Sequence, residues 1–184
     1  MQYEFSFDFK PTKFIGGWSN ILHLTTGGNA GWGERIPAFL MVNNKVAIAS
    51  AIDGNGNWYF WSPVLKINEW VHFRVTQTFE RHEYVYRVYM NKQLLKTKVN
   101  KRPEEFKQVD VWVSDNWYAA TPGYVKNIQF KGTFTSQALL TLRFSAIIAH
   151  MKHTNILDKK SISRKFDLRK RRFESSYAFT YLFN

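Results

Sequence analysis

The chain has 184 residues with 26 Lys and Arg against 14 Asp and Glu, and it has no cysteine. The absence of cysteine excludes disulfides, thiolate metal sites and a cysteine nucleophile. No apolar run approaches the ~20 residues that span a bilayer, and no signal peptide is visible, so we expect no transmembrane segment.

Alternation of apolar and polar residues predicts a series of strands in residues 1–132. The opening sequence YEFSFDFK has the period of two that is typical of a strand with one buried face, and Pro11 ends it. Further strands are predicted at 19–25, 37–42, 46–52, 58–61, 68–78, 84–90, 93–99, 106–114 and 123–130. The turn sequences GGN, NNK and DGNGN separate several of them. This pattern predicts an all-β fold, an antiparallel two-sheet jelly-roll sandwich over residues 1–132.

Residues 133–184 have a different composition, with no Gly, Pro or Trp and with 10 of the 26 basic residues. We expect a basic tail that is helical at 136–151 and otherwise disordered. The dense Lys and Arg of 159–172 leave three interpretations open: an anionic partner, a solvated segment, or translated non-coding sequence. Because the tail carries more than half of the net charge, the global charge does not predict nucleic-acid binding by the sandwich.

The order of these segments resembles that of the laminin-G-like and concanavalin A-like lectin/glucanase superfamily. The most specific part is NEWVHFRVTQ followed by YRVYMNKQLL, where a Trp opens a strand and a hairpin follows, and SDNWYAATPGYVKNIQF resembles the closing strand. The resemblance covers residues 2–131. It implies two curved sheets in a lectin-like module of a larger secreted, extracellular protein that binds a glycan or an extracellular protein. In some members a calcium ion lies at the rim.

A second, partial resemblance is to galectins. His23 followed by Trp32-Gly33-Glu34-Arg35 is similar to the stretch on their sugar-binding face. The Asn-Pro-Arg that galectins have just after the His is replaced here by LTTGGN, and an intervening strand is missing. We therefore do not expect galectin-like sugar chemistry.

Catalytic carboxylates are not predicted. Retaining glycosidases need two carboxyl groups ~5 Å apart, whereas Glu4 and Asp8 lie roughly 13 Å apart along a strand. Glu104 and Glu105 are adjacent and would face opposite sides of a strand. We expect no enzyme activity and no cofactor.

A weak metal hypothesis concerns Asp53 and Asn55, because DGNGN has a spacing of oxygen ligands that suggests calcium. It lacks the Glu that would complete a calcium-binding loop, and we prefer a glycine-rich hairpin turn. Asp115 with Asn116 is a weaker candidate.

Two polar, aromatic loops are candidate ligand sites. In the loop TTGGNAGWGER, Trp32 can stack on a sugar ring while Glu34 and Arg35 hydrogen-bond its hydroxyls. Asn116 and Trp117 have the same composition. The alternative is that these aromatic side chains plug the end of the sandwich.

Four consecutive aromatic residues, 58–61, must divide between the two faces of a strand, so one pair leaves the core. Such a patch can mark an interface, which makes a purely structural or assembly module the alternative function. Trp70 and Trp112 are expected to pack within the sheets.

Overall fold

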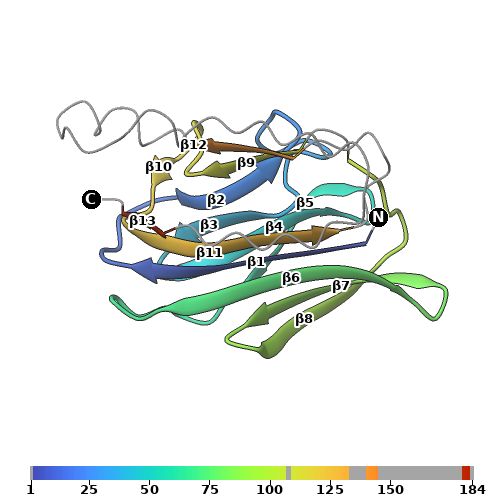
Figure 1. Ribbon diagram of the computed structural model, residues 1–184, viewed down its shortest axis with the longest axis horizontal. Coiled ribbons are helices and arrows are strands. Elements are labelled where there is room, and N and C mark those ends of the chain that lie inside the picture. The colour runs from blue at the N-terminus through green and yellow to red at the C-terminus, as the bar shows by residue number, and fades with distance from the viewer. Residues whose placement is uncertain (1, 107–108, 133–139, 145–179, 183–184) are drawn as a thin grey trace.

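The computed structural model describes residues 2–106, 109–132, 140–144 and 180–182. Within these ranges the chain forms strands, turns and loops and no helix. Two sheets pack as a sandwich (Figure 1), so the predicted all-β, jelly-roll-like fold is confirmed. The described residues therefore include no helix that could cross a membrane.

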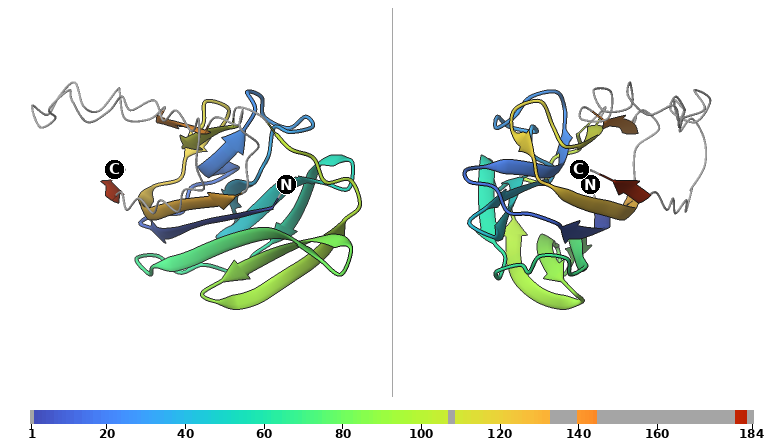
Figure 2. Two further views of the ribbon diagram at one scale, coloured as in Figure 1. Left: turned by 45° about the vertical axis from the view of Figure 1, so that its right-hand side comes forward. Right: turned by 90° about the vertical axis from the view of Figure 1, so that its left-hand side faces the viewer.

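The first sheet has the strand order β13-β11-β1-β6-β7-β8 and the second has the order β12-β9-β2-β3-β4-β5, with β10 beside β2. The bounds are β1 Tyr3–Pro11, β2 Ser19–Thr25, β3 Ala38–Val42, β4 Lys45–Ile52, β5 Asn55–Trp61, β6 Val71–Glu80, β7 Glu83–Met90, β8 Gln93–Asn100, β9 Val109–Val113, β10 Ala119–Ala120, β11 Gly123–Gly132, β12 Leu140–Phe144 and β13 Thr180–Leu182. The turned views of Figure 2 show the two sheets as curved layers.

The core lies between the sheets and is built from the alternating positions of the strands. Phe5, Phe7 and Phe9 of β1 are 0–1% exposed. The Phe7 ring meets Phe39 of β3 edge-on at 4.7 Å and stacks on Phe73 of β6 at 5.7 Å. Burying each such ring contributes about 1.5–3 kcal/mol. The buried aromatic face of β1, which the period of two predicted, therefore packs the two sheets together.

Short hairpins connect neighbouring strands. Both central residues have positive φ at Asn43-Asn44, at Asp53-Gly54 and at Asn91-Lys92, which is the geometry of the two-residue turn whose twist matches the flanking strands. The turns predicted at NNK and DGNGN are thus confirmed.

Two short strands come from the segment 133–184. Strand β12 pairs in parallel with β9, and β13 pairs antiparallel with β11. The helix predicted over 136–151 is wrong for residues 140–144, which are extended. Their sequence LTLRF fits a period of two as well as a helical period, and the open edge of β9 supplies backbone partners. The other residues of that range, and the basic stretch 159–172, lie outside the described residues.

Candidate functional site

The loop between β2 and β3 is folded around the carboxylate of Glu34. The backbone N–H of Ala30 donates to Glu34 Oε2 at 2.9 Å, and the N–H of Gly31 donates to the same oxygen. The chain passes so close that a Cβ at Gly28 would lie 2.0 Å from Glu34 Oε1. Glu34, predicted to bind ligand hydroxyls, therefore holds its own loop in shape.

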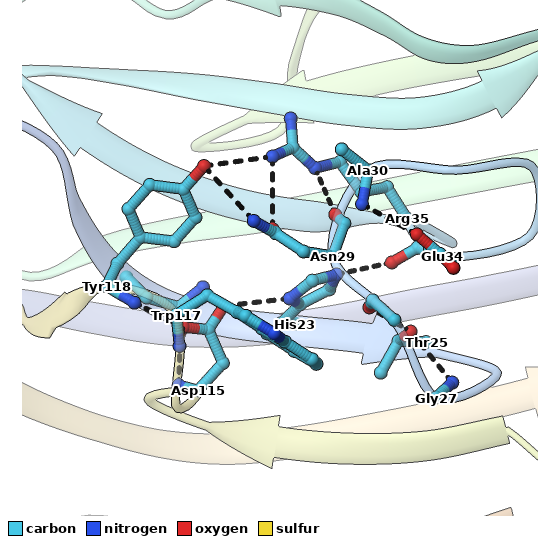
Figure 3. Close-up of polar contacts among 12 residues, drawn as sticks. His23, Thr25, Gly27, Asn29, Ala30, Glu34, Arg35, Asp115, Trp117 and Tyr118 are labelled. Atoms are coloured by element: carbon cyan, nitrogen blue, oxygen red, sulfur yellow. Dashed lines mark hydrogen bonds and ion pairs between the residues drawn. The ribbon is translucent and has the colours of Figure 1, made fainter.

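Arg35, which is only 6% exposed, forms its hydrogen bonds with other groups of the protein. Its Nε donates to the carbonyl of Asn29 at 2.7 Å, and its Nη2 donates to the Tyr118 hydroxyl at 3.2 Å. Its Nη1 donates to Oδ1 of Asn57 on β5. Arg35 thus links the loop to β5. Through Tyr118 it also links the loop to the segment before β10 (Figure 3).

A buried pair, His23 and Asp115, lies beneath this loop. His23 Nδ1 is 2.8 Å from Asp115 Oδ2, and both side chains are fully buried. His23 Nε2 is 2.5 Å from the carbonyl oxygen of Glu34 (Figure 3). Both ring nitrogens face acceptors, so a doubly protonated ring can donate to both of them. The pair connects β2 to the loop on one side and to the end of β9 on the other.

The segment after β9 is ordered by the same carboxylate. Asp115 Oδ1 accepts hydrogen bonds from the N–H groups of Trp117 and Tyr118, both at 3.0 Å. The Trp117 indole packs edge-on against His23 at 5.4 Å and approaches Trp112 at 6.5 Å, and it remains 40% exposed. Asn116 is exposed beside it.

Trp32 lies on the other side of the loop, at an open hollow of about 450 Å³. Its indole is 38% exposed, its Nε1 donates to a carboxylate oxygen of Glu104, and its ring lies 6.2 Å from that of Phe106. The residues that line the hollow are Trp32, Gly54, Arg102, Pro103 and Glu104. They come from three connections: β2–β3, β4–β5 and β8–β9.

The two candidate loops predicted from the sequence do meet, through Arg35 and Tyr118. Their indoles nevertheless belong to separate clusters, since Trp32 contacts Glu104 and Phe106 whereas Trp117 contacts His23 and Trp112. Sequence reasoning missed Arg102 and Glu104 as neighbours of Trp32. The segment between β8 and β9 has no pattern that would have singled it out.

Asp53, one of the weak metal candidates, lies in the β4–β5 turn, and Asn55, the other, is the first residue of β5. The Asp53 carboxylate is 3.8 Å from Lys98 Nζ, and Asn55 Oδ1 accepts a hydrogen bond from the N–H of Asn57. Across the described ranges, no group of three or more His, Asp or Glu could hold a metal ion. The calcium hypothesis stays a prediction.

The carboxylates considered for catalysis have separate partners. Glu4 contacts Arg74 at 3.2 Å and Lys131 at 3.7 Å. Asp8 accepts hydrogen bonds from His72 and from Asn127. Glu4 is therefore paired with two cations, and Asp8 is held by two hydrogen bonds.

The aromatic run of β5 divides between two faces as predicted. Trp58 packs against the core and meets the buried Tyr86 edge-on at 5.8 Å. Tyr59 and Trp61 lie on the outer face, 5.7 Å apart, and Trp18 packs on Trp61 at 5.6 Å.

Comparison with known proteins finds structural similarity but no matching sequence. No model of a known protein family matches this sequence, and no curated protein matches it. Among solved structures, the chain is similar to sheep galectin-11 in a complex with glycerol, with 14% identity and a TM-score of 0.34, covering 55% of this chain and 74% of that one. A likeness of this size says nothing about what this protein binds.

Proposed function

We propose that this protein is a non-catalytic recognition module that binds a carbohydrate at the hollow beside Trp32. The observation that carries the proposal is an exposed indole fixed beside a guanidinium and a carboxylate, all lining one hollow of about 450 Å³. Small-molecule sites are concavities of about 300–1,000 Å³ with a few placed polar groups. The extracellular setting implied by the resemblance belongs to the same proposal.

Each side chain of the hollow has a role that suits a sugar. The face of the Trp32 indole can take the C–H bonds of a pyranose, because aromatic faces carry negative charge. Arg102 offers several N–H donors to hydroxyl oxygens. Glu104 already accepts from Trp32 Nε1, but a carboxylate has about four lone-pair sites and can accept from a sugar hydroxyl as well.

The loop that presents Trp32 is pre-organised, which lowers the entropic cost of binding. Glu34 fixes the backbone at residues 30 and 31, and Arg35 ties the loop to Asn57 and Tyr118. In this proposal Glu34 and Arg35 position the site and do not contact the ligand. Trp117 and Asn116 lie outside the hollow.

The test is a glycan array followed by calorimetric titration of the full chain. Trp32→Ala should lower the affinity for each bound glycan at least tenfold, since it removes the stacking surface. Trp18→Ala is the matched control, because Trp18 is a similarly exposed indole, at 45%, outside the hollow. Equal binding by wild type and Trp32→Ala, or no bound glycan on the array, would refute the proposal.

A second variant tests the loop without touching the hollow. Gly28→Ala places a Cβ against the Glu34 carboxylate, so it should displace that carboxylate and weaken glycan binding several-fold. Gly16→Ala is its control, since no heavy atom lies within 4 Å of a Cβ there. Equal binding by both alanine variants would contradict the positioning role of Glu34.

An assembly module is the second candidate function. Trp18, Tyr59 and Trp61 form an aromatic patch, in which Tyr59 is 49% exposed. Strand β5 is the last strand in its sheet order, so a second copy could pair along it. Sedimentation equilibrium should then show a dimer that Tyr59→Lys dissociates. A wild-type monomer at all accessible concentrations would eliminate this candidate.

A further inference from the structure

On the outer face of the other sheet, two lysines converge on one exposed indole. Lys126 Nζ lies 4.0 Å from the centre of the Trp70 ring, and Lys10 Nζ lies 5.2 Å from the same centre. Lys10 Nζ is also 4.7 Å from the centre of the Tyr124 ring. Trp70 is 38% exposed, so it is not packed within the sheet as the sequence suggested. Significant cation–π contacts occur roughly once per 70–80 residues, whereas three meet here.

The strand register brings these side chains together. Phe9 of β1 points into the core, so Lys10 points outward. Lys10 lies directly opposite Tyr124 of β11, and Lys126 is the next residue on the same face of β11. The two lysines are therefore diagonal neighbours across the β1–β11 pair, which is close enough for both to contact one ligand.

The carboxylates nearest in register have other partners. Asp8 lies opposite Lys126, but its Oδ1 accepts from His72 Nδ1 and its Oδ2 from Asn127 Nδ2, both at 2.6 Å. Glu69, next to Trp70, pairs with Lys66 at 3.4 Å. Among the residues that the structure describes, no ion pair includes Lys10 or Lys126.

We propose that Lys10 and Lys126 form a binding site for one sulfate or phosphate ester group, with Trp70 and Tyr124 holding the two ammonium groups in place. Each ammonium has three donors, and a ring face occupies one direction only. Both ammonium groups lie within 5.2 Å of the Trp70 ring centre, so their like charges repel each other, and an anion that contacts both offsets this repulsion. Ammonium groups bind such oxyanions as point charges.

The surroundings favour a single ester group over a continuous polyanion. Asp8, Glu4 and Glu69 flank the two lysines on the same sheet face or the adjoining loop, and their negative charges interrupt any basic stripe. A nucleic acid needs several phosphate contacts in a row. The site is also on the sheet opposite the Trp32 loop, so it is independent of the proposed carbohydrate site.

The test is titration of the full chain with three probes: glucose 6-sulfate, glucose 6-phosphate and glucose. The resonance of the Trp70 indole N–H reports on binding by NMR. We expect it to shift with one or both esters and not with glucose, with affinity falling as salt rises. The two esters distinguish sulfate from phosphate as the natural group.

Lys10→Gln and Lys126→Gln should each weaken ester binding about tenfold, because each removes one charge-assisted contact. Lys96→Gln is the matched control. Lys96 also lies over an aromatic ring, that of Phe60, at 6.0 Å, but without a second lysine over the same ring. The Lys96→Gln variant loses one charge and should bind the esters like wild type. Equal binding of glucose and the esters, no binding of either ester, or wild-type affinity in both test variants would overturn the proposal.

Discussion

Removal of the Asp115 carboxylate should destabilise the protein more than any other single change at the candidate site. Asp115→Ala leaves the His23 ring without the oxygen that faces its Nδ1, and both side chains are fully buried. Leaving a buried hydrogen-bonding group without its partner costs about 1–3 kcal/mol, and more where a charged group is involved. Hydrogen bonds from the N–H groups of Trp117 and Tyr118 are lost too, each worth about 1 kcal/mol. We therefore expect a loss of about 4 kcal/mol or more, which lowers Tm by about 10 °C.

Asp115→Asn separates the charge from the hydrogen bonds. The Asn oxygen can keep the two backbone N–H groups, and its NH₂ can donate to Nδ1 of a neutral His23 whose Nε2–H still donates to Glu34. The cost should be about 1 kcal/mol.

Urea unfolding followed by tryptophan fluorescence measures both variants. Glu69→Ala serves as the control, since its ion pair with Lys66 is exposed and such pairs contribute about 0–1 kcal/mol. The reasoning fails if Asp115→Ala unfolds at the urea concentration of wild type, or if Asp115→Asn is as unstable as Asp115→Ala.

Two further predictions concern the sheets. Tyr86→Phe should lower the free energy of unfolding in urea by about 1–3 kcal/mol, because it leaves the buried Ser50 hydroxyl without the phenol oxygen that lies 2.5 Å away. Adding Ser50→Ala should recover part of this loss, and no recovery would contradict the pairing. Hydrogen bonds from Arg87 and Thr78 lower the pKa of Glu80 from 4.5 to about 2, so its contribution is present above pH ~4.5 and is lost as the pH falls toward 2. Glu80→Gln should therefore flatten the fall of the urea midpoint between pH 4.5 and 2, and an unchanged slope would disprove this origin.

The fold could be predicted because its signal is local. Alternation in YEFSFDFK and turn residues such as Asn43-Asn44 determine strand faces and hairpins without knowledge of distant partners. The division of residues 58–61 between two faces followed from the same rule. The helical interpretation of 136–151 failed at 140–144 because a short apolar run fits both periods, and a distant edge strand decided between them.

The candidate site could be predicted only in part. The glycine-bracketed Trp32 was recognisable as an exposed aromatic residue, but its partner Glu104 is 72 residues away in the chain. His23 and Asp115 are 92 residues apart. Glu34 and Arg35 were interpreted as ligand contacts because charged residues in glycine-rich loops are usually exposed. Composition does not reveal that this loop turns back on its own charged side chains.

The position of β1 in its sheet has a consequence for synthesis. The first strand of the chain is hydrogen-bonded on one side to β6 and on the other to β11, which begins at Gly123. During synthesis, the edge of β1 that pairs with β11 therefore stays without its partner strand until more than a hundred further residues have emerged from the ribosome. Chaperones that shield extended apolar segments would have a long opportunity to act at β1.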